Sequence, residues 1–197
     1  MLQNLYHEML VCRRQAFIKK EFMHNQKFNY ILILVLVSLG ILSRFLDHPA
    51  NFTPIAAIAL FVGVKLNSKI APFVSLIMIV ISDFFIGLHD VIFFTWGSFL
   101  IISLIGIYIR NRKGILPIIG GALVSSILFF IVTNFGVWMV GKWYELNLIG
   151  LIKCYTLAIP FFRNTLLGDL FYTGIFFGVY ELALYLNKKF HFQKLDI

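Results

Sequence analysis

The chain has 197 residues, of which 60% are hydrophobic and only 13% are charged, and its mean hydropathy is +0.88. A soluble globular domain has about 25% charged residues, so this composition excludes a water-soluble particle and predicts an integral membrane protein. The net charge of +8 fits the excess of Lys and Arg in the cytoplasmic loops of membrane proteins. We therefore expect a lipid bilayer around the chain and no nucleic-acid partner. The length allows one membrane domain without a second folded unit.

The first segment, 1–28, is basic, and an apolar run follows it directly. Because no small-residue cleavage site follows that run, we predict a signal anchor rather than a cleaved signal peptide. Met23 begins the stretch MHNQKFNYILILVLVSLG, which resembles a natural bacterial start. Residues 1–22 are then either an upstream extension or an interfacial helix, and both interpretations stay open.

Apolar segments follow in chain order, and each is a candidate membrane-spanning helix, which needs about 20 apolar residues, or fewer where the adjoining loops are buried in protein. The expected spans are 29–46, 53–66, 70–88, 91–109, 115–141 and about 162–187. The last apolar block begins at 148, and Pro160 predicts a break that separates a short interfacial or re-entrant piece from the sixth span. The expected organisation is therefore a cytoplasmic segment 1–28, a six-helix membrane domain 29–187 and a basic cytoplasmic tail 188–197.

The distribution of basic residues predicts the topology of these spans. Most of the 17 Lys and Arg residues fall on one side of the membrane if both termini are cytoplasmic. Positive charge marks the cytoplasmic side of membrane proteins. We therefore expect a multi-pass protein of the bacterial inner (plasma) membrane, with six transmembrane helices and both termini in the cytoplasm.

Polar residues near the outer ends of several spans form the candidate ligand-binding site. The stretch AIPFFRNTLLGDLFYTG, 158–174, is strongly apolar and yet carries two charges and an amide. A charge inside a bilayer costs about 2.5–3.5 kcal/mol on insertion scales and usually has a function. Apolar walls with a few convergent polar groups are typical of small-molecule sites. The candidate residues are Asp83, Trp96, Asn134, Arg163, Asn164, Asp169 and Tyr172.

Structural interpretations of the same residues stay open. Asn164 is also compatible with a helix cap after the proline, and Arg163 with a side chain that reaches the lipid headgroups. Asp83 and Asp169 are also compatible with structural ion pairs to Arg44 or Arg163. These alternatives predict no ligand.

The pattern GIFFG, 174–178, permits close helix packing within the molecule or against a partner. The sequence contains no phosphate-binding loop, zinc-protease motif, nucleophile elbow or CxxC motif. We therefore expect no enzymatic activity, no cofactor and no metal site, although a membrane enzyme with Asp83 or Asp169 as a base is a weaker alternative. Cys12 and Cys154 are far apart, and we expect no disulfide between them.

Four sequence blocks together resemble a family of small bacterial integral-membrane proteins of unknown function. The blocks are HPANFTPIAAIALFVG (48–63), SDFFIGLHD (82–90), TNFGVW (133–138) and AIPFFRNTLLGDLFYT (158–173), and the resemblance extends from 29 to about 187. The six-helix plan is similar to the substrate-binding S components of energy-coupling-factor vitamin transporters. This similarity implies an all-α, S-component-like bundle that binds a vitamin-like small molecule and works with a separate coupling subunit and ATPases.

The first span departs from S components in one respect. Those proteins often carry alanines at AxxxA spacing where the coupling subunit docks, whereas this span offers only Ser38, Gly40 and Ser43. Action without a shared coupling module is therefore also open. We predict binding and uptake of a small polar nutrient at an outward-facing pocket. The alternative is a non-transport scaffold of a cell-envelope complex, similar to rod-shape-determining membrane proteins.

Overall fold

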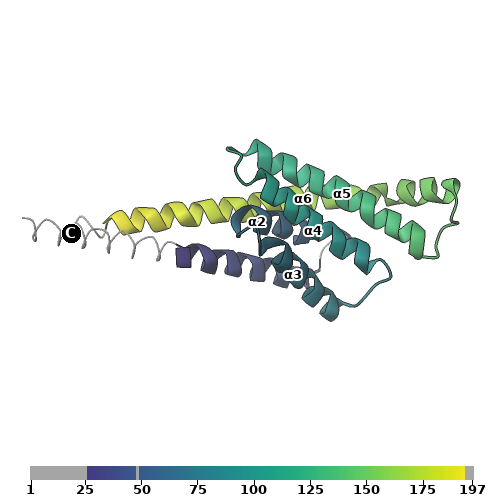
Figure 1. Cartoon of the computed structure of the whole chain (residues 1–197), viewed down its shortest axis with the longest axis horizontal. Coiled ribbons are helices and arrows are strands. Elements are labelled where there is room, and N and C mark those ends of the chain that lie inside the picture. Colours follow the sequence, from purple (N-terminus) through teal and green to yellow (C-terminus); the bar gives the residue numbers. More distant parts are fainter. Residues whose placement is uncertain (1–25, 48, 194–197) are drawn as a thin grey trace, which may run out of the picture.

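The computed structural model describes residues 26–47 and 49–193. Within these ranges the chain forms helices joined by short connections and contains no strand, so the predicted all-α class is confirmed (Figure 1). The helices are an N-terminal helix Gln26–Ser43, α2 (Ile55–Lys65), α3 (Ala71–Ile86), α4 (Ile92–Ile109), α5 (Leu116–Val140) and α6 (Leu148–Gln193).

Four of the described helices are long and apolar enough to cross a membrane. They are Gln26–Ser43, α4, α5 and the part of α6 from Leu148 to Lys189. Large apolar side chains cover the outside of the bundle, and Phe84, Phe93 and Ile149 are each at least 75% exposed. Lipid tails accept such a surface, whereas water does not. These features mark the chain as a membrane protein.

The short helix α2 lies at the centre of the bundle. It has 11 residues and is about 16 Å long at 1.5 Å per residue, well short of the roughly 30 Å hydrocarbon core. Every residue from Ile55 to Gly63 is buried, and α2 contacts α3, α4, α5 and α6. A helix that is hydrophobic all round is stable only when other elements cover all its faces. Here the longer helices provide that cover.

Two glycines bring α2 and α4 into close contact. A Cβ atom on Gly63 would overlap the carbonyl oxygen of Ser103, and one on Gly106 would lie 2.5 Å from the carbonyl oxygen of Leu60.

The C-terminal end of α2 is capped by the side chain of Arg110, which lies just after α4. Its guanidinium donates hydrogen bonds to carbonyl oxygens that have no partner inside α2. The acceptors are Gly63 (2.7 Å), Val64 (3.1 Å) and Leu66.

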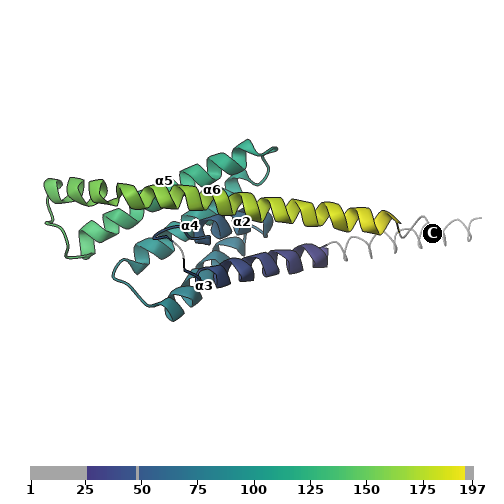
Figure 2. The same ribbon diagram turned by 180° about the vertical axis from the view of Figure 1, so that it is seen from behind.

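The prediction that Pro160 divides the last apolar block is wrong. α6 runs without a break through 46 residues, with Pro160 inside it (Figure 2). Proline removes one hydrogen bond from the helix, but contacts with α5 hold α6 on both sides of the proline. Before it, the Tyr155 hydroxyl donates to the Ile131 carbonyl oxygen at 2.7 Å. After it, the Phe162 ring lies 4.7 Å from the Phe130 ring.

The two ends of the described chain lie at the same end of the helix bundle. The N-terminal helix and the C-terminal half of α6 extend from the core in the same direction, and the α3–α4 and α5–α6 connections lie at the opposite end (Figures 1 and 2). The N-terminal helix also packs on α6, since a Cβ on Gly40 would lie 2.7 Å from the Phe176 ring. This arrangement places the polar ends of α3, α5 and the first half of α6 together, away from the termini.

Candidate functional site

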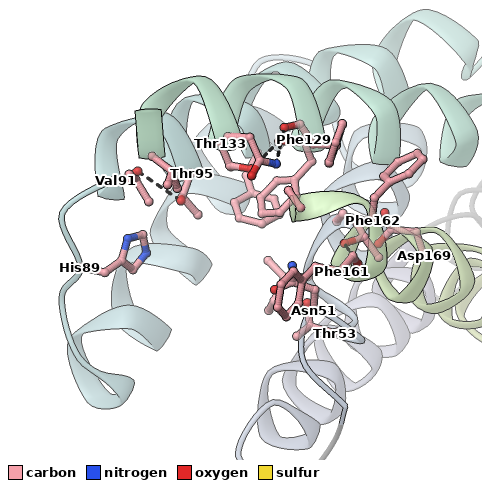
Figure 3. A pocket seen from close by; sticks show the side chains of 18 of the residues that line it. Asn51, Thr53, His89, Val91, Thr95, Phe129, Thr133, Phe161, Phe162 and Asp169 are labelled. Carbon is pink, nitrogen blue, oxygen red and sulfur yellow. Dashed lines mark hydrogen bonds between the residues drawn. The ribbon is translucent and has the colours of Figure 1, made fainter. Parts of the chain in front are cut away.

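A cavity of about 310 Å³ lies between the N-terminal ends of α2 and α4, the C-terminal half of α5 and the middle of α6. Its volume is at the lower limit of the range for small-molecule sites, about 300–1,000 Å³. Its mouth is formed by the segment between the N-terminal helix and α2 and by the α3–α4 connection (Figure 3). The lining residues are Arg44, Asn51, Thr53, Ile55, Ala56, His89, Val91, Thr95, Phe99, Phe129, Phe130, Thr133, Asn134, Val137, Ala158, Phe161, Phe162, Thr165 and Asp169.

Two predicted site residues, Asn134 and Asp169, line this cavity from facing helices. Asp169 on α6 is only 3% exposed. One of its oxygens, Oδ2, accepts a hydrogen bond of 2.6 Å from the hydroxyl of Ser126 on α5. Among the described residues, no ion pair involves Asp169. A buried carboxyl group therefore faces the cavity without a positive partner from the described part of the chain.

Three hydroxyl groups and one amide group of the cavity wall donate to backbone carbonyl oxygens four residues earlier in the chain. The four bonds are Thr95 to Val91 (3.3 Å), Thr133 to Phe129 (2.7 Å), Asn134 Nδ2 to Phe130 (2.8 Å) and Thr165 to Phe161 (3.1 Å). A hydroxyl has one hydrogen, so each threonine retains only oxygen lone pairs for other partners. The amide carbonyl of Asn134 likewise retains its acceptor oxygen. The cavity wall is thus rich in acceptors.

Asp83 belongs to a separate cluster beside the cavity. Its Oδ1 accepts from Arg44 Nη1 at 2.6 Å, and its Oδ2 accepts from the indole nitrogen of Trp96 at 2.9 Å. The same Arg44 nitrogen lies 2.6 Å from the Ser82 hydroxyl. The structural interpretation of Asp83, an ion pair with Arg44, is therefore confirmed. Arg44 also lines the cavity, whereas Asp83 and Trp96 lie outside its lining.

Asn164 and Tyr172 contact the segment before α2 and do not line the cavity. Asn164 Nδ2 donates to the Ala50 carbonyl oxygen at 3.0 Å, and the Tyr172 ring lies 5.5 Å from the ring of Phe52. Gly168 allows this approach, because a Cβ there would lie 3.2 Å from Phe52 Cα. Asn164 lies inside α6, so its interpretation as a helix cap is wrong. These contacts position the segment that forms the cavity mouth.

Arg163 points away from the cavity. Its side chain is exposed, it is absent from the lining, and no ion pair joins it to Asp169 in the described chain. This position agrees with the interpretation that the guanidinium reaches the lipid headgroups. Of the predicted site residues, Asp83, Trp96, Arg163, Asn164 and Tyr172 therefore lie outside the cavity.

Several cavity residues were not predicted, and some of them had a usable signal. Phe130 and Thr133 line the cavity, and Ser126, which donates to Asp169, lies beside it. Together with the predicted Asn134 they recur at i, i+4, i+7 and i+8, which is one face of a helix. That spacing identifies the face of α5 that points to α6. The aromatic walls had no such signal, because phenylalanine occurs throughout the chain, with 22 copies.

The glycines of the GIFFG pattern lie on the outer surface of α6. Gly174 and Gly178 are both exposed, and a Cβ on either would meet no heavy atom within 4 Å among the described residues. The pattern is therefore not used for packing within the described part of the molecule.

The described residues offer few side chains for metal binding or cysteine chemistry. Among the described residues, no group of three or more His, Cys, Asp or Glu side chains could hold a metal ion. Cys154 is buried with a free thiol, and its Sγ lies 3.4 Å from the Asn134 carbonyl oxygen. Cys12 and His48 lie outside the described residues.

Comparison with known proteins gives one result. A family model described as a family of unknown function, DUF6580, matches residues 24–194. No curated protein and no solved structure matches the chain.

Proposed function

The chain belongs to the DUF6580 family of unknown function, and from this premise we propose that it binds a small polar, vitamin-like nutrient in the cavity and takes part in its uptake. The observation that carries the proposal is the Asp169 carboxyl, buried in the wall of a cavity of ligand size. Ionisable groups inside a membrane domain are expensive and usually serve a ligand, an ion path or a structural pair. Asp169 has no ion-pair partner among the described residues, which favours a ligand.

The proposed layout has six membrane crossings, S-component-like, with both termini in the cytoplasm of a bacterium and the cavity facing outward across its plasma membrane. The excess of Lys and Arg near the termini and the α4–α5 connection supports this orientation. The common direction of the N-terminal helix and the end of α6 supports it too (Figure 1). In this layout α2, in which every residue from Ile55 to Gly63 is buried, is enclosed by α3, α4, α5 and α6.

Uptake also needs a source of energy, and the sequence has no nucleotide-binding loop. We propose a separate coupling subunit with its own ATPases, as in the transporters that the six-helix plan resembles. The exposed glycines Gly174 and Gly178 support a contact with such a subunit, because small residues let helices approach closely in a membrane.

Native mass spectrometry of the protein, gently extracted from the membranes of its own host, tests the binding function. The expected result is a bound small molecule in the wild-type protein that is lost in Asp169→Asn. The matched control is Glu181→Gln, because it removes the same charge from the same helix at an exposed site outside the cavity. It should retain the ligand. A wild-type protein that carries no small molecule in repeated extractions would contradict the proposal.

A scaffold in a cell-envelope complex is the second candidate, and the exposed Gly174–Gly178 face favours it as well. In that case Asp83 and Asp169 stabilise the bundle only. Leucine at both glycines should then release a membrane partner and alter cell shape, while Asp169→Asn should leave both unchanged in folded protein. A nutrient-uptake defect in Asp169→Asn cells of normal shape would contradict the scaffold.

A further inference from the structure

We propose that the ligand of this cavity is an organic cation: a small molecule that carries an ammonium or similar group on an apolar, preferably aromatic, body. The inference rests on the proposed binding function and specifies the chemical class of its ligand. It excludes anionic nutrients such as carboxylates and phosphates as the preferred occupants.

The first step is the hydrogen-bonding character of the wall. The hydroxyl protons of Thr95, Thr133 and Thr165 and one Nδ2 proton of Asn134 are directed to backbone carbonyl oxygens four residues earlier, as described above. The three threonines retain only oxygen lone pairs for a ligand, and the Asn134 amide retains its oxygen and one N–H (Figure 3). An ammonium group has up to three donors and no acceptor, so it complements this wall. A carboxylate or phosphate has acceptors only and does not.

The second step is charge. Arg44 is the arginine of the lining, and its Nη1 is 2.6 Å from Asp83 Oδ1, so its charge is already neutralised. Asp169 lacks an ion-pair partner in the part of the chain that the structure describes. A charge buried without a partner is costly, and a cation beside it recovers much of that cost. A ligand with a positive group would supply the partner that the described residues do not.

The third step is the apolar part of the wall. The rings of Phe99, Phe129, Phe130, Phe161 and Phe162 line the cavity. Phenyl faces attract cations within about 6 Å of the ring centre, and they also pack against flat apolar groups. Aromatic rings around a carboxyl group are therefore suited to an ammonium on an apolar body.

The mouth sets the orientation of such a ligand. Figure 3 shows His89 and Asp169 at opposite ends of the cavity lining, with Asn51 and Thr53 between them. His89 and Asn51 are exposed, whereas Asp169 is buried. The positive group would lie inside at Asp169, and polar substituents at the other end of the ligand would face the mouth.

Three probes of nearly equal size test the inference: 2-phenylethylammonium, 2-phenylethanol and phenylacetate. Their binding is measured at pH 7 by titration calorimetry with the full chain in lipid nanodiscs, and empty nanodiscs serve as the blank. We expect the ammonium probe to bind at least about tenfold more tightly than the alcohol or the acid. Asp169→Asn should reduce this preference about tenfold or more, which corresponds to about 1.4 kcal/mol. Glu181→Gln should leave the preference unchanged.

Each other outcome overturns the inference in a distinct way. If phenylacetate or phenylethanol binds as tightly as the ammonium probe, the cavity binds ligands but does not prefer cations. If the preference survives in Asp169→Asn, the cation is held elsewhere. If no probe binds although native mass spectrometry finds a ligand, the ligand belongs to another class and the proposed function stands. If neither method finds a ligand, the proposed function fails and the inference fails with it.

Discussion

The carboxyl group of Asp169 on α6 accepts a hydrogen bond of 2.6 Å from the hydroxyl of Ser126 on α5, and this contact joins the two longest helices beside the cavity. The same hydroxyl lies 3.0 Å from the Ala122 carbonyl oxygen. Because a hydroxyl has a single hydrogen, these two acceptors compete for it. The shorter distance favours the carboxyl group, which has no other hydrogen-bond partner among the described residues.

The first prediction compares the neighbouring serines of α5. Ser126→Ala should lower the free energy of unfolding by about 1–3 kcal/mol, because it leaves a buried carboxyl group without its hydrogen bond. Ser125→Ala is the matched control, since the Ser125 hydroxyl donates only to the Gly121 carbonyl of its own helix. It should have little effect, because alanine has the higher helix propensity. Thermal unfolding in detergent measures both, and equal losses would contradict the role of Ser126.

A second prediction concerns the ion pair between Arg44 and Asp83. Asp83 is 1% exposed, so Asp83→Asn or Arg44→Gln should each destabilise the protein by about 3–5 kcal/mol, because each leaves a charge without its partner. In the double variant, the free energy of unfolding should fall by less than the sum of the two single decreases. The control is the pair between Lys65 and Glu181, whose carboxylate side chain is 62% exposed. Removing it should cost only about 0–1 kcal/mol. Additive losses at Arg44 and Asp83 would show that the pair is not coupled.

Much of the fold could be predicted from the sequence, because the apolar runs are bounded by charged or polar loops. The expected spans 91–109 and 115–141 agree closely with α4, Ile92–Ile109, and α5, Leu116–Val140. The continuity of α6 could not be predicted. Proline is a local signal for a break, but the contacts with α5 that bridge it come from residues distant in sequence, such as Ile131.

The candidate site could be predicted only in part, because position along a span gives depth but not direction. Asn134 and Asp169 line the cavity, as predicted. Asp83 lies on α3, whose inner face points to Arg44 instead. Arg163 is separated from Asp169 by six positions, which differs from a whole number of turns, and it faces outward. The buried face of each helix depends on how it packs against the other helices. The sequence of one span alone does not determine it.

A third prediction tests the crossing of α2 and α4. Gly63→Ala places a methyl group against the backbone carbonyl of Ser103, and backbone cannot move aside as a side chain can. We expect the free energy of unfolding to fall by at least about 3 kcal/mol, or the protein to fail to fold, as for other overpacked core positions. Gly97→Ala on α4 is the control, because no heavy atom lies within 4 Å of its added Cβ. It should be neutral or stabilising by about 0.5–1 kcal/mol. A folded Gly63→Ala variant of unchanged stability, measured by thermal unfolding, would contradict this packing.

The last prediction concerns the bond that holds the mouth of the cavity to α6. Asn164→Ala removes the hydrogen bond from the side-chain amide to the Ala50 carbonyl oxygen, which is 3.0 Å long. A hydrogen bond contributes about 0.5–1.5 kcal/mol net, so hydrogen exchange in the segment 49–53 should accelerate about two- to tenfold. The backbone amide of Phe52 reports on this segment, because it donates to the Pro49 carbonyl oxygen at 2.9 Å.

Arg163→Gln is the control for this experiment, because it changes the neighbouring residue on α6 but alters a side chain that points away from the segment. Its exchange rates over 49–53 should match those of the wild type. Global stability should change little in either variant, since the rest of α6 keeps its contacts with α5. If exchange in this segment is unchanged in Asn164→Ala, then the close approach at Gly168 and the tilted contact between the Phe52 and Tyr172 rings suffice to hold the mouth, and the Asn164 hydrogen bond does not position it.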